Sequence, residues 1–159
     1  MNKLLSMLTS GAAICASTAA FACPDPASGD ANNIVAENAY DLLTAMTIGV
    51  DIGGSTPWSD CGIPGNGYLP SKASVRLDLR AAEGKQLVVG LTKGCPQTHM
   101  FVSAGDFRGT ASGDPSTGTV SVNIPRANIG NDQTIMVYLS ADSPGVVCSG
   151  EITFYTARG

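Results

Sequence analysis

Apolar and polar residues alternate along several short stretches of the chain, and the clearest case is residues 73–80. The apolar positions there are Val75, Leu77 and Leu79, and the residues between them are charged. This period of two is that of a β-strand with one buried face. Residues 85–92 repeat the pattern, and the short segment 81–84 between the two stretches predicts a hairpin loop.

Five more segments combine β-branched residues or alternation with flanking turns rich in Gly, Pro, Asp, Asn and Ser. They are residues 44–51, 98–104, 119–124, 133–140 and 151–157. An eighth strand is expected near residues 33–36, a single helical turn at 38–43 and a loop over 105–118. Seven to eight short strands at this spacing predict an all-β fold, an antiparallel and jelly-roll-like β-sandwich.

The first 22 residues have the features of an export signal. Lys3 supplies a positive start, a stretch of apolar and small residues follows, and Ala20, Phe21 and Ala22 form a small-x-small cleavage site. Polar residues interrupt the stretch, which argues against a membrane anchor. We therefore expect a periplasmic or secreted protein with no membrane insertion after signal cleavage.

The chain that remains after removal of residues 1–22 is expected to have two parts. Residues 23–43 are expected to form an acidic lead-in, and residues 44–159 are expected to form the β-sandwich domain. Cys23 directly follows the cleavage site, so lipidation of this cysteine is an alternative to its pairing in a disulfide.

Four cysteines remain after the signal is removed: Cys23, Cys61, Cys95 and Cys148. An even number in an exported chain predicts a disulfide framework, with three pairings open. We favour Cys95–Cys148, because each of these residues lies beside a predicted strand, and Cys23–Cys61, which would anchor the N-terminus. The chain contains no Cys-x-x-Cys pair, so a zinc site is disfavoured.

The composition narrows the class of protein further. Only 14% of the residues are charged, Gly and Pro are abundant with 19 and 9 residues, and the net charge is -4. A chain without a basic surplus is a poor candidate for nucleic-acid binding. The acidic residues of the N-terminal third are Asp25, Asp30, Glu37, Asp41, Asp51 and Asp60. They admit a calcium-stabilised structural protein as an alternative, although a solvated surface explains them equally simply.

The chemistry available to the chain is limited by its one histidine, His99. Blue-copper sites need two histidines, and no Gly-x-Ser-x-Gly nucleophile motif is present. A small periplasmic hydrolase or redox enzyme that uses Cys95 and His99 stays open as an alternative, provided that Cys95 is a free thiol. We expect no enzyme, no catalytic residue, no metal and no cofactor.

Aromatic residues on predicted loops are the candidate ligand-binding positions. Trp58 and Tyr68 flank the Gly-rich segment around Cys61, and Phe107 and Arg108 lie in the predicted loop 105–118. Aromatic rings on loops can stack on sugars or on partner side chains. The alternative is that these rings close one end of the sandwich.

Several segments together resemble a known family. They are residues 61–68, 75–79, 87–95, 135–139 and 148–154. The pattern is similar to the small jelly-roll domains of exported bacterial proteins that are related to bacterial pre-peptidase C-terminal domains, over residues 44–156. The resemblance implies a β-sandwich without catalytic residues. The sequence therefore predicts an exported, non-enzymatic binding or accessory module whose ligand is an unknown protein or glycan.

Overall fold

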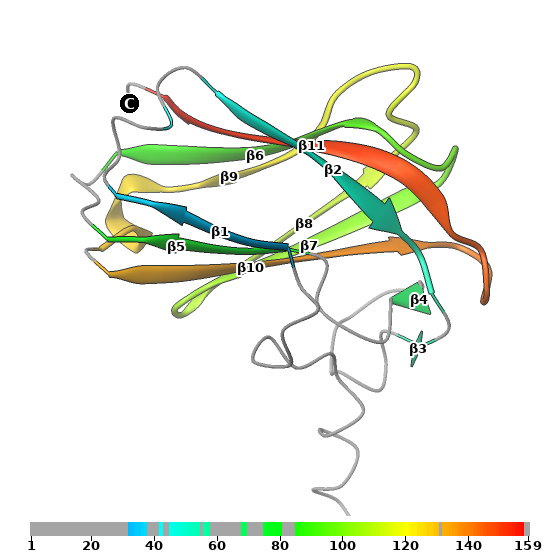
Figure 1. Ribbon diagram of the computed structural model, residues 1–159, viewed down its shortest axis with the longest axis horizontal. Helices are drawn as coiled ribbons and strands as arrows, with labels where there is room; N and C mark the ends of the chain where they lie inside the picture. Colours follow the sequence, from blue (N-terminus) through cyan, green and yellow to red (C-terminus); the bar gives the residue numbers. More distant parts are fainter. Residues whose placement is uncertain are drawn as a thin grey trace, which may run out of the picture.

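The protein is described by a computed structural model that covers residues 32–37, 42, 45–54, 56–57, 68–69, 75–80, 85–130 and 132–157, with only the backbone at 56, 57, 68 and 69. Two β-sheets face each other as a sandwich (Figure 1). Within the described residues, no helix has the length and apolar character needed to cross a membrane. The predicted signal, residues 1–22, lies outside them.

One sheet has seven strands and the other has four. The seven-stranded sheet contains β1 (Asn32–Ala36), β3 (Thr56–Pro57), β4 (Tyr68–Leu69), β5 (Val75–Leu79), β7 (Thr98–Ala104), β8 (Phe107–Gly113) and β10 (Gln133–Ala141). The four-stranded sheet contains β2 (Met46–Ile52), β6 (Gln86–Lys93), β9 (Val120–Ile124) and β11 (Cys148–Ala157). A 3-10 turn, η5 (Arg126–Asn128), precedes β10. The all-β sandwich predicted from the sequence is thereby confirmed.

The core lies between the sheets and is filled by the alternating residues that the sequence pattern indicated. In β5, Val75, Leu77 and Leu79 are buried while the charged residues between them are half-buried. β9 alternates between buried and exposed residues in the same way. Among the described residues, the largest fully buried side chain is that of Phe154 in β11. Burial of one face thus follows directly from the period of two along each strand.

β10 is the strand that holds the seven-stranded sheet together. It pairs antiparallel with β5 through Gln133–Val137 and with β7 through Ile135–Ala141, and β8 pairs with the far side of β7. In the other sheet, β11 lies between β2 and β6, and β9 pairs with β6. Each central strand therefore has both of its hydrogen-bonding edges in use.

The expected eighth strand exists as β1, but its direction differs from the antiparallel arrangement predicted for the sandwich. β1 pairs parallel with β5, with Ile34 opposite Leu77. A parallel pair needs a crossover of a dozen or more residues, and the chain between Ala36 and Val75 is long enough to supply it. The sandwich is therefore mostly, not entirely, antiparallel.

Two local predictions are wrong. β5 and β6 do not form a hairpin, because β5 pairs with β1 and β10 while β6 pairs with β11 and β9. The expected loop 105–118 contains a full strand, β8. Its inward positions include Gly109 and Ala111. Because these residues are small, the sequence shows no clear alternation of apolar and polar positions. Gly109 is needed there because a Cβ atom would lie 2.6 Å from Val122 Cγ1.

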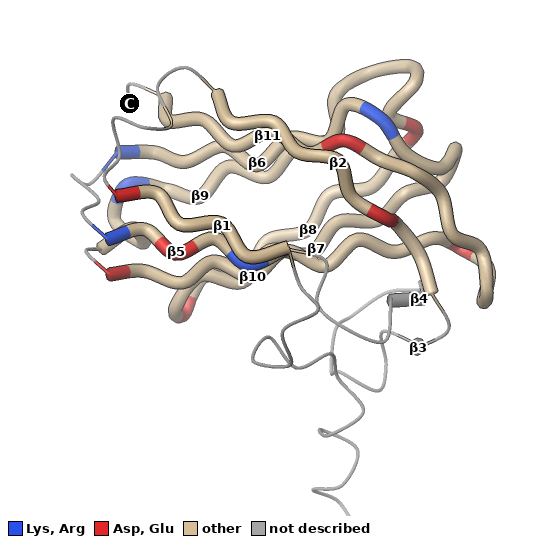
Figure 2. Tube along the Cα trace, in the orientation of Figure 1, with Lys and Arg blue, Asp and Glu red and all other residues tan. Residues whose placement is uncertain are grey.

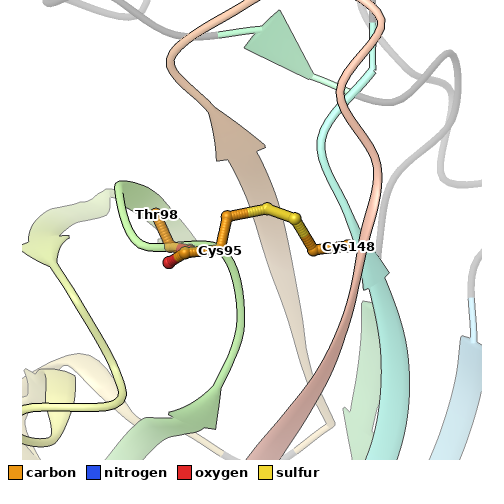
Figure 3. Close-up of a disulfide and its surroundings, with 3 residues drawn as sticks. All are labelled: Cys95, Thr98 and Cys148. Atoms are coloured by element: carbon orange, nitrogen blue, oxygen red, sulfur yellow. A yellow bond between two sulfur atoms is a disulfide. The ribbon is translucent and has the colours of Figure 1, made fainter.

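The disulfide between Cys95 and Cys148 is present, as predicted (Figure 3). It links the segment after β6 to the first residue of β11, with 5.6 Å between the Cα atoms. The buried Thr98 hydroxyl donates a hydrogen bond of 2.8 Å to the carbonyl oxygen of Cys95. Cys23 and Cys61 lie outside the described residues, as does most of the predicted helical turn at 38–43.

Candidate functional site

The two outer faces of the sandwich differ in chemistry. On the four-stranded sheet the outward residues include the paired Tyr155 and Val88, and most of the others are small and polar. The hydroxyls of Thr47 and Thr153 are 2.9 Å apart, and Lys93 and Glu151 form an ion pair of 3.2 Å. Such a surface is ordinary for a solvated sheet. The outer face of the seven-stranded sheet carries a larger apolar group at its centre.

We call this central part the aromatic strip, which consists of Phe101, Met136 and Tyr138. Phe101 of β7 lies opposite Tyr138 of β10, and their ring centroids are 5.9 Å apart with the planes tilted by 40°. Met136 is only 8% exposed and packs with Tyr138 in a cluster separate from the main core. The two aromatic side chains are half-buried. The cluster therefore lies on the outer side of the sheet, apart from the main core.

A small polar network lies on the same face next to the aromatic strip. The Asp78 carboxylate accepts a hydrogen bond of 3.1 Å from Arg76 Nε and one of 2.9 Å from the Thr134 hydroxyl. These residues border a pocket of about 200 Å³. Its lining consists of Arg76, Asp78, Leu79, Arg80, Asp132, Gln133 and Thr134. Among the described residues that line this pocket, two are basic and two are acidic, so charges of both signs border it.

A second polar group lies at the other end of the same face and is centred on His99. Strand pairing places His99 of β7 directly opposite Ser112 of β8, and 2.7 Å separates His99 Nδ1 from the Ser112 hydroxyl. His99 Nε2 contacts the Asp142 carboxylate. We call Ser112, His99 and Asp142 the His99 cluster. The side chain of His99 is 17% exposed and that of Asp142 is 49% exposed, so the cluster is open to solvent.

Asp142 is held in place by the turn between β10 and β11. The N–H of Gly145 donates a hydrogen bond of 2.9 Å to the Gly54 carbonyl, and the N–H of Gly53 donates one of 3.1 Å to the Leu139 carbonyl. Gly53 has φ of 102°, and a Cβ atom there would lie 1.9 Å from the Val146 carbonyl oxygen. Only glycine permits this close approach, which joins the end of β2 to the turn.

Another pocket, of about 290 Å³, lies where β1 approaches β2. It is lined by Asn32, Gly49, Val50, Asp51, Ser149 and Gly150. Of the described lining residues, Asp51 is the one that is ionisable, and the others are mostly small. We regard this pocket as chemically less specific than the aromatic strip with its two polar neighbours.

The structure separates the ligand-binding residues that the sequence suggested. Phe107 faces inward and packs against the core, whereas Arg108 faces outward. Arg108 Nη1 donates hydrogen bonds to the carbonyls of Gly105 and Phe107, so its side chain folds back on its own turn. Trp58 lies outside the described residues, and only the backbone of Tyr68 is described, in β4.

Sequence reasoning missed Met136, Tyr138, Ser112 and Asp142. A signal for the first two was present, because the segment 135–139 is apolar at every position instead of at alternate ones. Neither Ser112 nor Asp142 has a comparable signal, since their link to His99 arises only from strand pairing and a turn.

The alternative site of Cys95 and His99 has no support in this form of the protein. Cys95 is bonded to Cys148, so it carries no thiolate, and the ring nitrogens of His99 contact Ser112 and Asp142. His99 lies on β7, within the strand expected at residues 98–104.

Charges of both signs are interspersed along both sheets (Figure 2). No group of three or more His, Cys, Asp or Glu side chains that could hold a metal ion occurs among the described residues. Of the acidic residues behind the calcium alternative, only Glu37 and Asp51 belong to the described part of the chain.

The turn after β8 leads to a prediction about pH. The Asp114 carboxylate accepts hydrogen bonds of 2.6 Å from the Ser116 hydroxyl and 2.9 Å from the Ser116 N–H, and these bonds lower the pKa of Asp114. Because the pKa of the folded state is below that of the unfolded state, the contribution to stability exists above the ordinary pKa and is lost as the pH falls through the depressed one. We expect Ser116→Ala to raise the pKa of Asp114 in an NMR titration, and Ser121→Ala to leave it unchanged.

Comparison of the chain with models of known protein families and with curated proteins found no match.

Proposed function

We propose that the chain is an exported binding or accessory module that holds a partner protein on the outer face of the seven-stranded sheet. The observation that carries this proposal is the aromatic strip, in which Phe101, Met136 and Tyr138 form an apolar cluster outside the core. Protein interfaces are enriched in aromatic residues, Met and Arg relative to the rest of the surface. The strip and Arg76, which lies opposite Met136, match this composition.

The polar groups beside the aromatic strip favour specific binding of a partner over nonspecific adhesion of apolar surfaces. Asp78 and His99 already have hydrogen-bonding partners within the protein, so their geometry is fixed before a partner arrives. A pre-organised surface loses less side-chain entropy on binding. A glycan is the competing ligand, because rings and fixed polar groups also suit sugars.

Export is supported by the sequence and is compatible with the disulfide. The features of residues 1–22 predict a signal peptide, and the Cys95–Cys148 bond is typical of an oxidising compartment. A periplasmic or secreted location is therefore part of the proposal. The resemblance to pre-peptidase C-terminal domains implies a β-sandwich without catalytic residues, which fits a binding module.

A double substitution tests the binding surface. We expect Phe101→Ser with Tyr138→Ser to weaken a partner's Kd by about tenfold or more, because buried aromatic anchors dominate interfaces. The measurement is capture of exported proteins on the immobilised protein, identification of those lost with the variant, and titration with each purified candidate.

Tyr155→Ala is the matched control. Tyr155 is 38% exposed and lies on the outer face of the other sheet, so its removal should leave the Kd unchanged. Equal capture by the wild type and the double variant would contradict the proposal. Retention of polysaccharides by the wild type and not by the double variant would instead identify a glycan ligand and overturn the choice of a protein.

A further inference from the structure

We propose that Ser112 is a nucleophile for acyl transfer, with His99 as its general base and Asp142 as the residue that positions His99. The observation behind this inference is the His99 cluster, which is separate from the aromatic strip. The inference adds a chemical reactivity that the binding proposal does not require.

The three side chains come from different parts of the fold. Ser112 and His99 lie 13 positions apart on paired strands, and Asp142 lies 43 positions from His99 in the turn that Gly53 and Gly145 hold. A serine, a histidine and a carboxylate joined in this order make up the triad of many hydrolases, which is recognised by geometry and not by chain order.

The direction of the hydrogen bonds follows from the donors and acceptors available. An ionised carboxylate only accepts, so Asp142 fixes the proton of neutral His99 on Nε2. Nδ1 then carries the lone pair and accepts from the hydroxyl of Ser112, at 2.7 Å. This polarity is the one that a general base requires. The two ring nitrogens exchange the roles that they have in most serine hydrolases, but either nitrogen can accept a proton.

The reaction that follows is hydrolysis of an ester in two steps. Ser112 Oγ attacks the carbonyl carbon while its proton moves to His99 Nδ1, and the leaving alcohol departs with that proton, which gives an acyl-serine. Water then attacks the acyl carbon, passes a proton to His99, and releases the carboxylic acid as Ser112 recovers its proton. The water and the ester are the two reactants, and no oxidant or reductant is needed.

The surroundings indicate the class of substrate. Ser112 is exposed on the outer face of the sheet, and Phe101 lies two positions from His99 along the same face of β7. A small ester with an apolar acyl or aryl group can therefore reach Ser112 while its apolar part contacts Phe101.

The test is covalent labelling of the full chain with a fluorophosphonate probe, combined with hydrolysis of p-nitrophenyl acetate. We expect one label per chain, located on Ser112 by peptide mass spectrometry, and loss of both label and hydrolysis in Ser112→Ala. His99→Gln should slow labelling by roughly a hundredfold, which is the usual contribution of a general base. Ser121→Ala, at an exposed serine of β9 on the other sheet, is the control and should react like the wild type.

The test of Asp142 must distinguish a role in positioning His99 from a purely structural role. Asp142→Asn should slow labelling and Asp142→Glu should restore part of the rate, while both variants keep the Cys95–Cys148 disulfide and the circular dichroism of the wild type. The inference is overturned if Ser112 takes up no label, or if His99→Gln labels as fast as the wild type. Because Ser112→Ala leaves the aromatic strip intact, failure here is distinguishable from failure of the binding proposal.

Discussion

Replacing Phe154 with alanine should lower the free energy of unfolding by about 3–5 kcal/mol, the range for removal of a buried aromatic side chain. Phe154 is fully buried in β11, where strand pairing places it between Met46 of β2 and Val89 of β6. The substitution removes apolar contact from the middle of the core and leaves a cavity. Domains of this size are stable by only about 5–15 kcal/mol, so the loss is a large fraction of the total.

Urea unfolding followed by circular dichroism measures this effect, which should appear as a lower midpoint at an unchanged slope. Tyr155→Ala is the control because it removes an aromatic side chain from the next position of the same strand, on the opposite face. Tyr155 is 38% exposed, and its loss should cost less than about 1 kcal/mol. Equal losses in the two variants would show that Phe154 does not lie in the core.

The second large effect is expected from removal of the Cys95–Cys148 disulfide by substitution of both residues with alanine. The two cysteines are 53 positions apart, and closing a loop of that length stabilises a folded chain by about 4 kcal/mol in the chain-entropy model. The double substitution avoids leaving a free thiol, and it also trims the buried Cys95 side chain, which adds to the loss. Unfolding in urea without reductant gives the measurement.

Reductant provides the control for the disulfide. Wild-type protein treated with dithiothreitol should also lose stability, because reduction breaks the same bond while the buried Cys95 side chain stays in place. Any further loss that dithiothreitol causes in the double variant reports a second disulfide, which the sequence predicts between Cys23 and Cys61. Stability that stays the same in the double variant would contradict a structural role for the Cys95–Cys148 bond.

The strands were predicted correctly where buried and exposed residues alternate along the chain. In β5 and β9 each inward residue is apolar and each outward residue is polar, so the period of two was visible in the sequence. β8 was missed because its inward face uses the small residues Gly109 and Ala111, and Gly109 fits beside Val122 only because it has no side chain. The requirement for small residues comes from the opposite sheet. As a result, large apolar residues do not alternate with polar residues along this part of the sequence.

The candidate site was less predictable than the fold. Phe107 and Arg108 are adjacent in the sequence, yet they point to opposite sides of β8. Ser112 and Asp142 reach His99 only through the register of β7 with β8 and through the turn after β10. No local pattern encodes a contact that depends on which strands become neighbours.

The sequence by itself determined that the chain is all-β, which faces of most strands are buried, and that Cys95 and Cys148 lie at strand ends, because these properties depend on local periodicity and turn chemistry. The tertiary structure decided that β1 runs parallel to β5, that β5 and β6 belong to different sheets, and that an apolar cluster and a Ser–His–Asp group share one outer face. The physical reason is that the backbone hydrogen bonds of an extended strand can be formed with any other strand. Packing of the whole core therefore selects which strands pair.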